Sequence, residues 1–420
     1  MKIGVDLRCL NYAKYTGINA YCIHILGCLS TLKELHQIEF VGIGLKKTRL
    51  YELQNEFDLF NTLFSSLRTL EEYNIFDIKN TKVLELVLCG QIYIKNSLDC
   101  VDLENFDYFI QPQPRLIKLN PSTKLITFYH DVFDILEGRF RLNKILNNRK
   151  NWMLIAARSN VIITNSRSTS IDLVKFLDID KSKINLIYPG TPNLDLFRNS
   201  TIFKNSRHPE LDSGPPTTQT TGISKATTIK NNPSVLDSNL IINDRSQTNE
   251  TKPYILAISG IEPRKNWHNI ILAFKHLQIN NDYDKRLILA GTIVDRNYYN
   301  YLQKLIQIHK VNNIEWVIEP NENVKNNLIR DCLFVAYPSF YEGFGFPILE
   351  AQKYKKSVLT SKNSSLVEIN PSNIFIDPNN YISIANGVLL MTEVEFAESK
   401  TRFSWDELLI ALEKMLIKCS

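Results

Sequence analysis

Two glutamates lie on either side of a glycine-rich segment in the second half of the chain. In YPSFYEGFGFPILEA, residues 337–351, Glu342 and Glu350 flank Gly343 and Gly345. Two carboxylates can act as a general acid and base, hold a metal ion or bind the hydroxyl groups of a sugar. Glycines that precede a helix also let backbone N–H groups approach a phosphate. These residue types predict a functional site, and the spacing alone leaves its chemistry open.

The elements predicted around this segment place both glutamates near the carboxyl end of a strand. CLFVAYP is typical of a buried strand that ends at Pro338, and SFYEGFGF is typical of a loop. PILEAQKYKK predicts a helix that begins at Pro347, where the missing N–H of proline breaks no hydrogen bond. A carboxylate repels a phosphate but accepts hydrogen bonds from vicinal hydroxyls. Glu342 in the loop and Glu350 in the helix could therefore serve one ligand, and a ribose with a diphosphate fits.

A second strand-to-helix turn carries two adjacent cations. YILAISGIEPRKNWHNIILAF predicts a strand, a loop with Arg264 and Lys265, and a helix that Asn266 caps. The two side chains can neutralise a diphosphate, Arg264 as a planar fork and Lys265 as a point charge. In TFYHDVFDIL, His130 and Asp131 directly follow a predicted strand. Functional side chains gather at such positions in parallel sheets.

Short apolar runs alternate with helical patterns through both halves of the chain. The strand-like runs are KIGVDL, EFVGIGL, DYFIQP, LITFYH, VIITNS and INLIYPG in the first half, and YILAISG, RLILAG, EWVIEP, CLFVAYP, SVLTS and IFIDP in the second. Many are apolar on both faces, as buried parallel strands are. The α/β class is therefore predicted, with two doubly wound, Rossmann-like domains that face one another.

A polar segment separates the two halves. Residues 199–252 are rich in Ser, Thr, Asn and Pro and nearly lack aromatic side chains. Such a segment buries too little apolar surface to offset the entropy of ordering, so we expect a disordered insertion. The predicted organisation is an N-terminal domain over residues 1–196, the insertion over 197–252, a second domain over 253–400, and a helix over 401–420 that packs back across the domains.

The composition, with 44% hydrophobic and 22% charged residues, is ordinary for a soluble globular protein. The 420 residues carry a net charge of +5, which suits an anionic partner without indicating nucleic acid. The sequence contains no run of 18 apolar residues, so we predict no membrane span. The first residues lack the pattern of a signal peptide. The seven cysteines form no C-x-x-C pair, which argues against a zinc site and a disulfide framework. A cytoplasmic location is expected.

Other motifs are interpreted as structural. The D-x-D patterns at Asp178–Asp180 and Asp282–Asp284 do not directly follow buried strands, so we interpret both as solvated turns and predict no metal site. The G-x-G at residues 42–44 lacks the third glycine of a dinucleotide motif.

Taken together, these segments resemble the family-4 glycosyltransferases of the GT-B fold. The opening stretch is similar to the nucleotide-sugar signature of that family, two glutamates separated by seven residues. IGVDLRCL and TGINAY are similar to its N-terminal strand and glycine loop, YHDVFD to its His-Asp turn, and SGIEPRKN to its Arg-Lys clamp. The resemblance covers both halves and skips the insertion. It implies two Rossmann-like domains that face each other across a cleft.

The resemblance also implies roles for individual residues. Arg264 and Lys265 would bind the donor diphosphate, while Glu342 and His130 would face the donor sugar. Glu350 would bind the ribose hydroxyls, and Gly17 would lie close to the diphosphate and the acceptor. Residues near Glu319 would contact the nucleobase edge. The phosphate and the sugar would contact the backbone of Gly343, Phe344, Gly345 and Phe346.

The implied reaction transfers a hexose, with mannose preferred, from a nucleoside-diphosphate sugar to a glycan or lipid-linked acceptor, with retention at the anomeric carbon. The resemblance implies that cations and a helix end take the place of a metal, and that no cofactor beyond the donor is needed. Lipopolysaccharide biosynthesis is the expected setting. The basic stretch Gly138–Met153, in which apolar residues are interleaved, could contact an anionic membrane at its inner face.

Two alternatives remain open at this point. A nucleotide-sugar epimerase of the same architecture would use the same donor site without an acceptor. A degenerate, non-catalytic nucleotide-sugar binder would keep the fold and lose the chemistry.

Overall fold

The computed structural model describes residues 1–11, 17–69, 84–88, 91–95, 105–117, 119–136, 142–198, 253–369, 374–393 and 403–417. Nearly all of the predicted insertion, residues 199–252, lies outside the described residues.

The first sheet in the described part of the chain has seven parallel strands. Their order is β3-β2-β1-β6-β7-β8-β9. The strands are β1 (Lys2–Asp6), β2 (Glu39–Leu45), β3 (Phe64–Thr69), β6 (Tyr108–Gln111), β7 (Lys124–Tyr129), β8 (Val161–Thr164) and β9 (Ile184–Leu186). Six of them coincide with apolar runs of the sequence. The exception is β3, whose sequence FSSLRT is too polar to be recognised as a buried strand. An antiparallel pair, β4 (Leu84–Leu88) and β5 (Gln91–Lys95), was also not predicted.

The second sheet has six parallel strands in the order β12-β11-β10-β13-β14-β15. They are β10 (Tyr254–Ile258), β11 (Arg286–Gly291), β12 (Ile314–Ile318), β13 (Val335–Tyr337), β14 (Val358–Ser361) and β15 (Phe375–Ile376). All six were predicted, because each lies in a short apolar run of the sequence.

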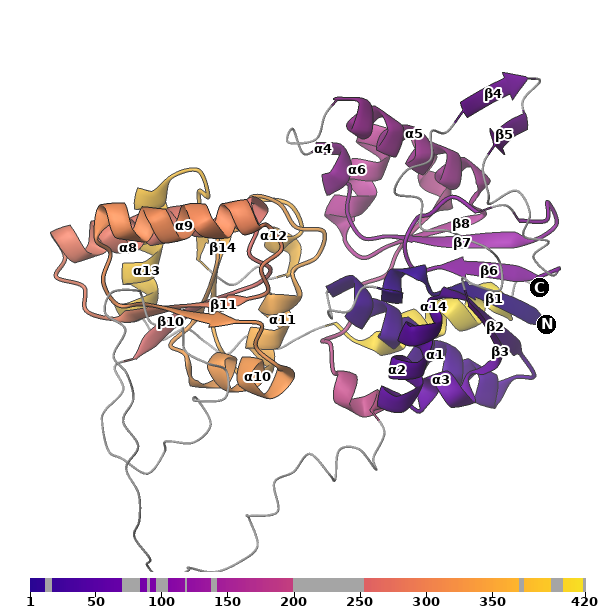
Figure 1. The fold of residues 1–420 in the computed structure, drawn as a ribbon, viewed down its shortest axis with the longest axis horizontal. Helices are drawn as coiled ribbons and strands as arrows, with labels where there is room; N and C mark the ends of the chain where they lie inside the picture. The colour runs from indigo at the N-terminus through magenta and orange to yellow at the C-terminus, as the bar shows by residue number, and fades with distance from the viewer. Residues whose placement is uncertain are drawn as a thin grey trace, which may run out of the picture.

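Helices cover both faces of the sheets. The first sheet is accompanied by α1 (Gly17–Leu35), α2 (Lys47–Glu56), α3 (Leu59–Thr62), α4 (Phe133–Leu136), α5 (Leu142–Arg158) and α6 (Arg167–Leu177). The second is accompanied by α8 (Trp267–Asn280), α9 (Arg296–His309), α10 (Glu322–Asp331), α11 (Phe346–Lys353), α12 (Leu366–Ile369) and α13 (Tyr381–Glu393). Figure 1 shows α8 and α9 on one face of the second sheet and α10 and α11 on the other.

Several helix starts follow from local sequence. The side chains of Ser166, Asn321 and Ser404 accept hydrogen bonds from backbone N–H groups in the first turns of α6, α10 and α14 (Trp405–Leu416). Such caps satisfy donors that have no partner within the helix.

The last described helix returns to the first domain. Three leucines of α14, Leu408, Leu412 and Leu416, are fully buried in the core that also contains α1. Trp405 stacks on His24 with ring centroids 4.2 Å apart, and its Nε1 donates to the carbonyl oxygen of Thr191 at 3.0 Å. In Figure 1 this yellow helix lies within the indigo and purple lobe. The end of the chain therefore completes the core of the N-terminal domain.

Each sheet has one point at which the strand order reverses, between β1 and β6 and between β10 and β13. Ligands of open α/β sheets bind at such points, beyond the carboxyl ends of the strands. The predicted α/β class with two Rossmann-like domains is confirmed, because the described residues form two parallel sheets in two lobes. No helix among the described residues has both the length and the apolar character needed to cross a bilayer.

Candidate active site

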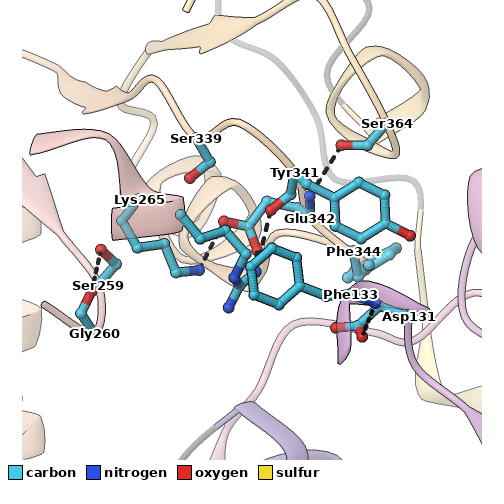
Figure 2. A network of polar contacts seen from close by, with 12 residues as sticks. Asp131, Phe133, Ser259, Gly260, Lys265, Ser339, Tyr341, Glu342, Phe344 and Ser364 are labelled. Atoms are coloured by element: carbon cyan, nitrogen blue, oxygen red, sulfur yellow. Dashed lines mark hydrogen bonds and ion pairs between the residues drawn. The ribbon is translucent and has the colours of Figure 1, made fainter. Parts of the chain in front are cut away.

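A buried ion cluster lies where the second sheet reverses its strand order. Arg264 and Lys265 follow β10, and Glu342 follows β13, its neighbour in the sheet. One carboxylate oxygen of Glu342 accepts from Lys265 Nζ at 2.7 Å, and the other accepts from Arg264 at 2.8 Å. Glu262 pairs with the other terminal nitrogen of Arg264 at 2.7 Å. Figure 2 shows Glu342 beside Lys265 at the centre of this network.

The backbone around Asn266 brings the two loops together. Pro263–Lys265 form one turn of 3-10 helix, and Asn266 then takes a left-handed conformation with φ 62° before α8 begins. Its side chain does not cap the helix, so that prediction was wrong. The side-chain amide of Asn266 donates instead to the carbonyl oxygens of Pro338 and Pro378, at 2.9 and 2.7 Å. Asn266 therefore fixes the cation turn against the Glu342 loop.

The electrostatics of the cluster keep Glu342 ionised. Burial alone would raise the pKa of the Glu342 carboxyl, but the charges of Arg264 and Lys265 outweigh burial and lower that pKa to about 2. Burial and the neighbouring guanidinium lower the pKa of Lys265. Two carboxylates, Glu342 and Glu262, thus balance two cations. The cluster is neutral without a ligand, and an anion that enters must share the cations with Glu342.

The loop that carries Glu342 is held at several points. Ser364 Oγ accepts from the N–H of Glu342, and Ser365 Oγ lies within hydrogen-bonding distance of the carbonyl oxygens of Glu342 and Phe344, at 2.9 and 2.8 Å. Gly345 adopts φ 109°, which favours glycine, and directly precedes α11. Pro347 lies in the first turn as predicted, but α11 ends at Lys353, three residues before the predicted end.

Glu350 pairs with a different cation from Glu342. Lys325, from α10, donates to Glu350 and to Glu322 at 2.9 Å each. Burial disfavours the charged form of Lys325, but the two carboxylates outweigh it and raise its pKa. In this structure the two glutamates of the motif therefore lie in separate ion pairs, one after β13 and one on α11.

His130 contacts the Glu342 loop through its backbone. The ring lies edge-on to Tyr21 with centroids 4.8 Å apart, and Nε2 lies 2.6 Å from the carbonyl oxygen of Pro112, to which a protonated Nε2 donates. Burial lowers the pKa of His130, which favours the neutral ring. A Cβ added to Gly343 would lie 2.0 Å from the carbonyl oxygen of His130. Gly343 is thus required where the domains meet.

Of the other predicted residues, Gly17 and Phe344 lie near the same junction, and Glu319 does not. A Cβ added to Gly17, the first residue of α1, would lie 3.2 Å from the ring of Phe346. Phe344 is buried and contacts Tyr188 and Phe346. Glu319 is exposed and lies at the end of β12, two strands from β10, with φ 55°. The structure therefore brings Gly17 and His130 to the α11 loop and leaves Glu319 at the outer edge.

Sequence reasoning missed several residues that shape the site. Tyr337 Oη accepts from Lys265 Nζ at 3.0 Å. Phe133, from the N-terminal domain, lies against both Arg264 and Tyr341, with centroid distances of 4.9 and 6.0 Å. Only Lys325 had a visible signal, its spacing of three residues from Glu322 on one helix face. The others depend on contacts between distant segments, which no local pattern shows.

Within the described ranges, no group of three or more His, Cys, Asp or Glu side chains is placed to hold a metal ion. Asp178 and Asp282 both take left-handed backbone conformations in turns, and Asp180 accepts from the N–H of Ser182. These D-x-D segments therefore lie in turns, as predicted.

Two comparisons with known proteins concern parts of the chain. Residues 240–405 match the family model described as glycosyl transferases group 1. The chain therefore contains a segment that is similar to glycosyltransferase group 1 domains. A segment of 118 residues is 33% identical to O-antigen chain mannosyltransferase B of Escherichia coli, and this match covers 28% of the chain and 30% of that protein.

Solved structures resemble the whole chain. A glycosyltransferase from Rickettsia africae has a TM-score of 0.62 at 17% identity, with 100% of this chain and 99% of that chain covered. Alr3699/HepE of Anabaena, in complex with UDP and glucose, has a TM-score of 0.61 at 13% identity, with both chains fully covered. At these identities the likeness supports the GT-B fold, and the group 1 domain supports a glycosyltransferase.

Proposed function

We propose that the protein is a retaining glycosyltransferase that moves a hexose from a nucleoside-diphosphate sugar to a hydroxyl group of a glycan or lipid-linked acceptor. The observation that carries the proposal is the buried Arg264–Lys265–Glu342 cluster at the strand reversal of the group 1 domain. A nucleotide-sugar donor agrees with the UDP and UDP-glucose complexes of the structural neighbours.

In this proposal the cations stabilise the diphosphate that leaves. Arg264 and Lys265 would bind its oxygens as negative charge develops, and Glu342 would turn from the cations toward the hydroxyls of the transferred sugar. Glu350, which Lys325 holds, would bind the ribose hydroxyls. No metal or cofactor is required in this scheme, because fixed cations balance the diphosphate.

Mannose is the proposed sugar, since the similar segment belongs to an O-antigen chain mannosyltransferase. The acceptor would then be part of a cell-surface polysaccharide. The predicted membrane stretch supports a lipid-linked acceptor, although residues 138–141 and the side chains of 142–147 lie outside the described part. Flotation with liposomes tests this contact. Stronger binding to anionic than to neutral liposomes is expected, and equal binding would contradict an electrostatic contact.

A transfer assay tests the function itself. The protein is incubated with GDP-mannose, UDP-glucose and related donors together with lipid-linked glycan acceptors, and products are analysed by mass spectrometry and anomeric NMR. We expect one donor to yield a glycoside with the anomeric configuration of the donor. Release of an epimerised free sugar without acceptor would favour the epimerase. Donor binding without turnover across the acceptor panel would favour the non-catalytic binder.

A further inference from the structure

Helix α6 of the N-terminal domain makes a set of polar contacts with the domain that carries Glu342. Tyr341 Oη donates to a carboxylate oxygen of Asp172 at 2.7 Å. The hydroxyl of Thr169 lies 3.3 Å from the carbonyl oxygen of Gly343 and 3.1 Å from that of His130, so its one proton can serve either. Residues on both sides of Glu342 are thus in contact with one helix of the opposite domain.

The start of α6 is bound by the same domain. One carboxylate oxygen of Glu368 accepts from the N–H of Arg167 at 2.9 Å, and the other accepts from the N–H of Ser168 at 3.0 Å. Tyr188 Oη also donates to Glu368 at 2.9 Å. A carboxylate at a helix N-terminus satisfies free N–H groups and interacts favourably with the helix dipole. Glu368 therefore holds α6 against the second domain at a further point.

An aromatic contact supports the same arrangement. The ring of Phe133 stacks on Tyr341 with an angle of 21° between the planes. The Arg264 guanidinium also lies over the Phe133 ring, 4.9 Å from its centroid. Figure 2 shows Phe133 and Asp131 beside Tyr341 and Glu342. The N-terminal domain thus contacts the residue before Glu342, the residue after it and one of its cations.

We propose that α6 positions Glu342 through Asp172 and Tyr341, so that the Glu342 loop reaches its working geometry only when the two domains are closed on each other. The inference rests on the proposed function for its catalytic consequence. Asp172 and Tyr341 are positioning residues in this account, because they act on the loop that carries Glu342. A misplacement of a catalytic group by about 1 Å lowers a rate on the order of 100-fold.

Two variants and a matched control test the proposal. Tyr341→Phe removes the hydroxyl and keeps the ring on Phe133, and Asp172→Asn removes the charge of its partner. Tyr283→Phe is the control, because its hydroxyl bonds Thr392 within one domain. We expect kcat of both test variants to fall about 10- to 100-fold while Kd for the donor changes less than about threefold. The control should retain both constants.

Unchanged kcat in both test variants would overturn the proposal, as would a loss of donor affinity that accounts for the whole loss of kcat/KM. Hydrogen exchange of the peptide covering residues 339–346, in the protein without donor, provides a readout that does not depend on activity. Exchange should be faster in Asp172→Asn and Tyr341→Phe than in wild type and Tyr283→Phe. If the wild type transfers no sugar, the proposed function fails, and equal exchange rates would separately overturn the positioning role.

Discussion

Replacing Glu342 with glutamine tests the energetics of the ion cluster. Glutamine keeps the shape of the side chain but removes the charge that balances two cations. The side chains of Lys265 and Arg264 are 9% and 16% exposed, so neither cation regains full hydration. Removing one partner of a buried ion pair costs about 3–5 kcal/mol. Because Glu262 and Tyr337 retain contacts with the cations, the lower end is expected.

The pKa of Glu342 gives the same magnitude by a second route. It falls from an ordinary value of 4.5 to about 2 on folding. At about 1.4 kcal/mol per unit, this shift corresponds to about 3 kcal/mol of folding free energy. Since the folded state has the lower pKa, this stabilisation is present above pH 4.5 and is lost as pH falls toward 2. The contribution of Glu342 to the pH dependence of stability should be absent in Glu342→Gln.

The assay is thermal unfolding of wild type and Glu342→Gln between pH 7 and pH 3, with and without a nucleoside diphosphate. At pH 7 the domain that contains Glu342 should unfold about 6–12 °C lower in the variant, from 2–4 °C per kcal/mol. The difference should shrink as pH falls. A nucleoside diphosphate should stabilise the variant more than wild type, because in the variant the ligand does not compete with the Glu342 carboxylate for the two cations. Equal melting temperatures at pH 7 would refute the reasoning.

Three further predictions concern other parts of the structure. In calorimetry, Lys325→Met should weaken binding of a ribonucleoside diphosphate about tenfold and leave binding of its 2′,3′-dideoxy analogue unchanged. The reason is that Lys325 holds Glu350, the carboxylate proposed to bind the ribose hydroxyls. Equal losses of affinity for both ligands would contradict that role. Gly343→Ala should lower sugar transfer more than Gly260→Ala, since the added Cβ meets the His130 carbonyl in the first case and only the exposed Val294 side chain in the second. Burial lowers the pKa of His24 to about 4, and its Nε2 accepts from the backbone N–H of Asn193. The free energy of unfolding should therefore fall by about 3 kcal/mol between pH 6.5 and pH 4, as urea titrations at each pH would measure. A decline of the same size in His24→Gln would show that other groups cause it.

Much of the fold was predictable because buried parallel strands leave a strong local signal. Runs such as YILAI and RLILAG are apolar on both faces and are separated by helical patterns. β3 and the pair β4–β5 lack that signal, since FSSLRT and QIYIK are short and partly polar. The leucines of α14 fit any apolar surface, so their spacing alone does not show which core the helix joins.

The candidate site was predictable in its members and not in its pairing. The sequence placed Arg264, Lys265 and Glu342 after two strands as candidate residues, and the structure joins them in one ion cluster. The sequence could not show that Glu342 would bind both cations, because side-chain direction in a loop depends on tertiary contacts such as those of Asn266 and Ser365. Gly343 was interpreted as an approach to a ligand, whereas the structure brings it against the backbone of His130.

The most direct test of the account is calorimetric titration of wild type and Lys265→Ala with GDP and UDP. Lys285→Ala is the control, because among the ion pairs described Lys285 pairs only with Asp284 on the surface. The account predicts one site per chain in wild type and in Lys285→Ala. It predicts a loss of about 10- to 100-fold in affinity in Lys265→Ala, since hydrogen bonds to charged groups contribute about 1.5–3 kcal/mol. Wild-type affinity in a folded Lys265→Ala protein would contradict the account.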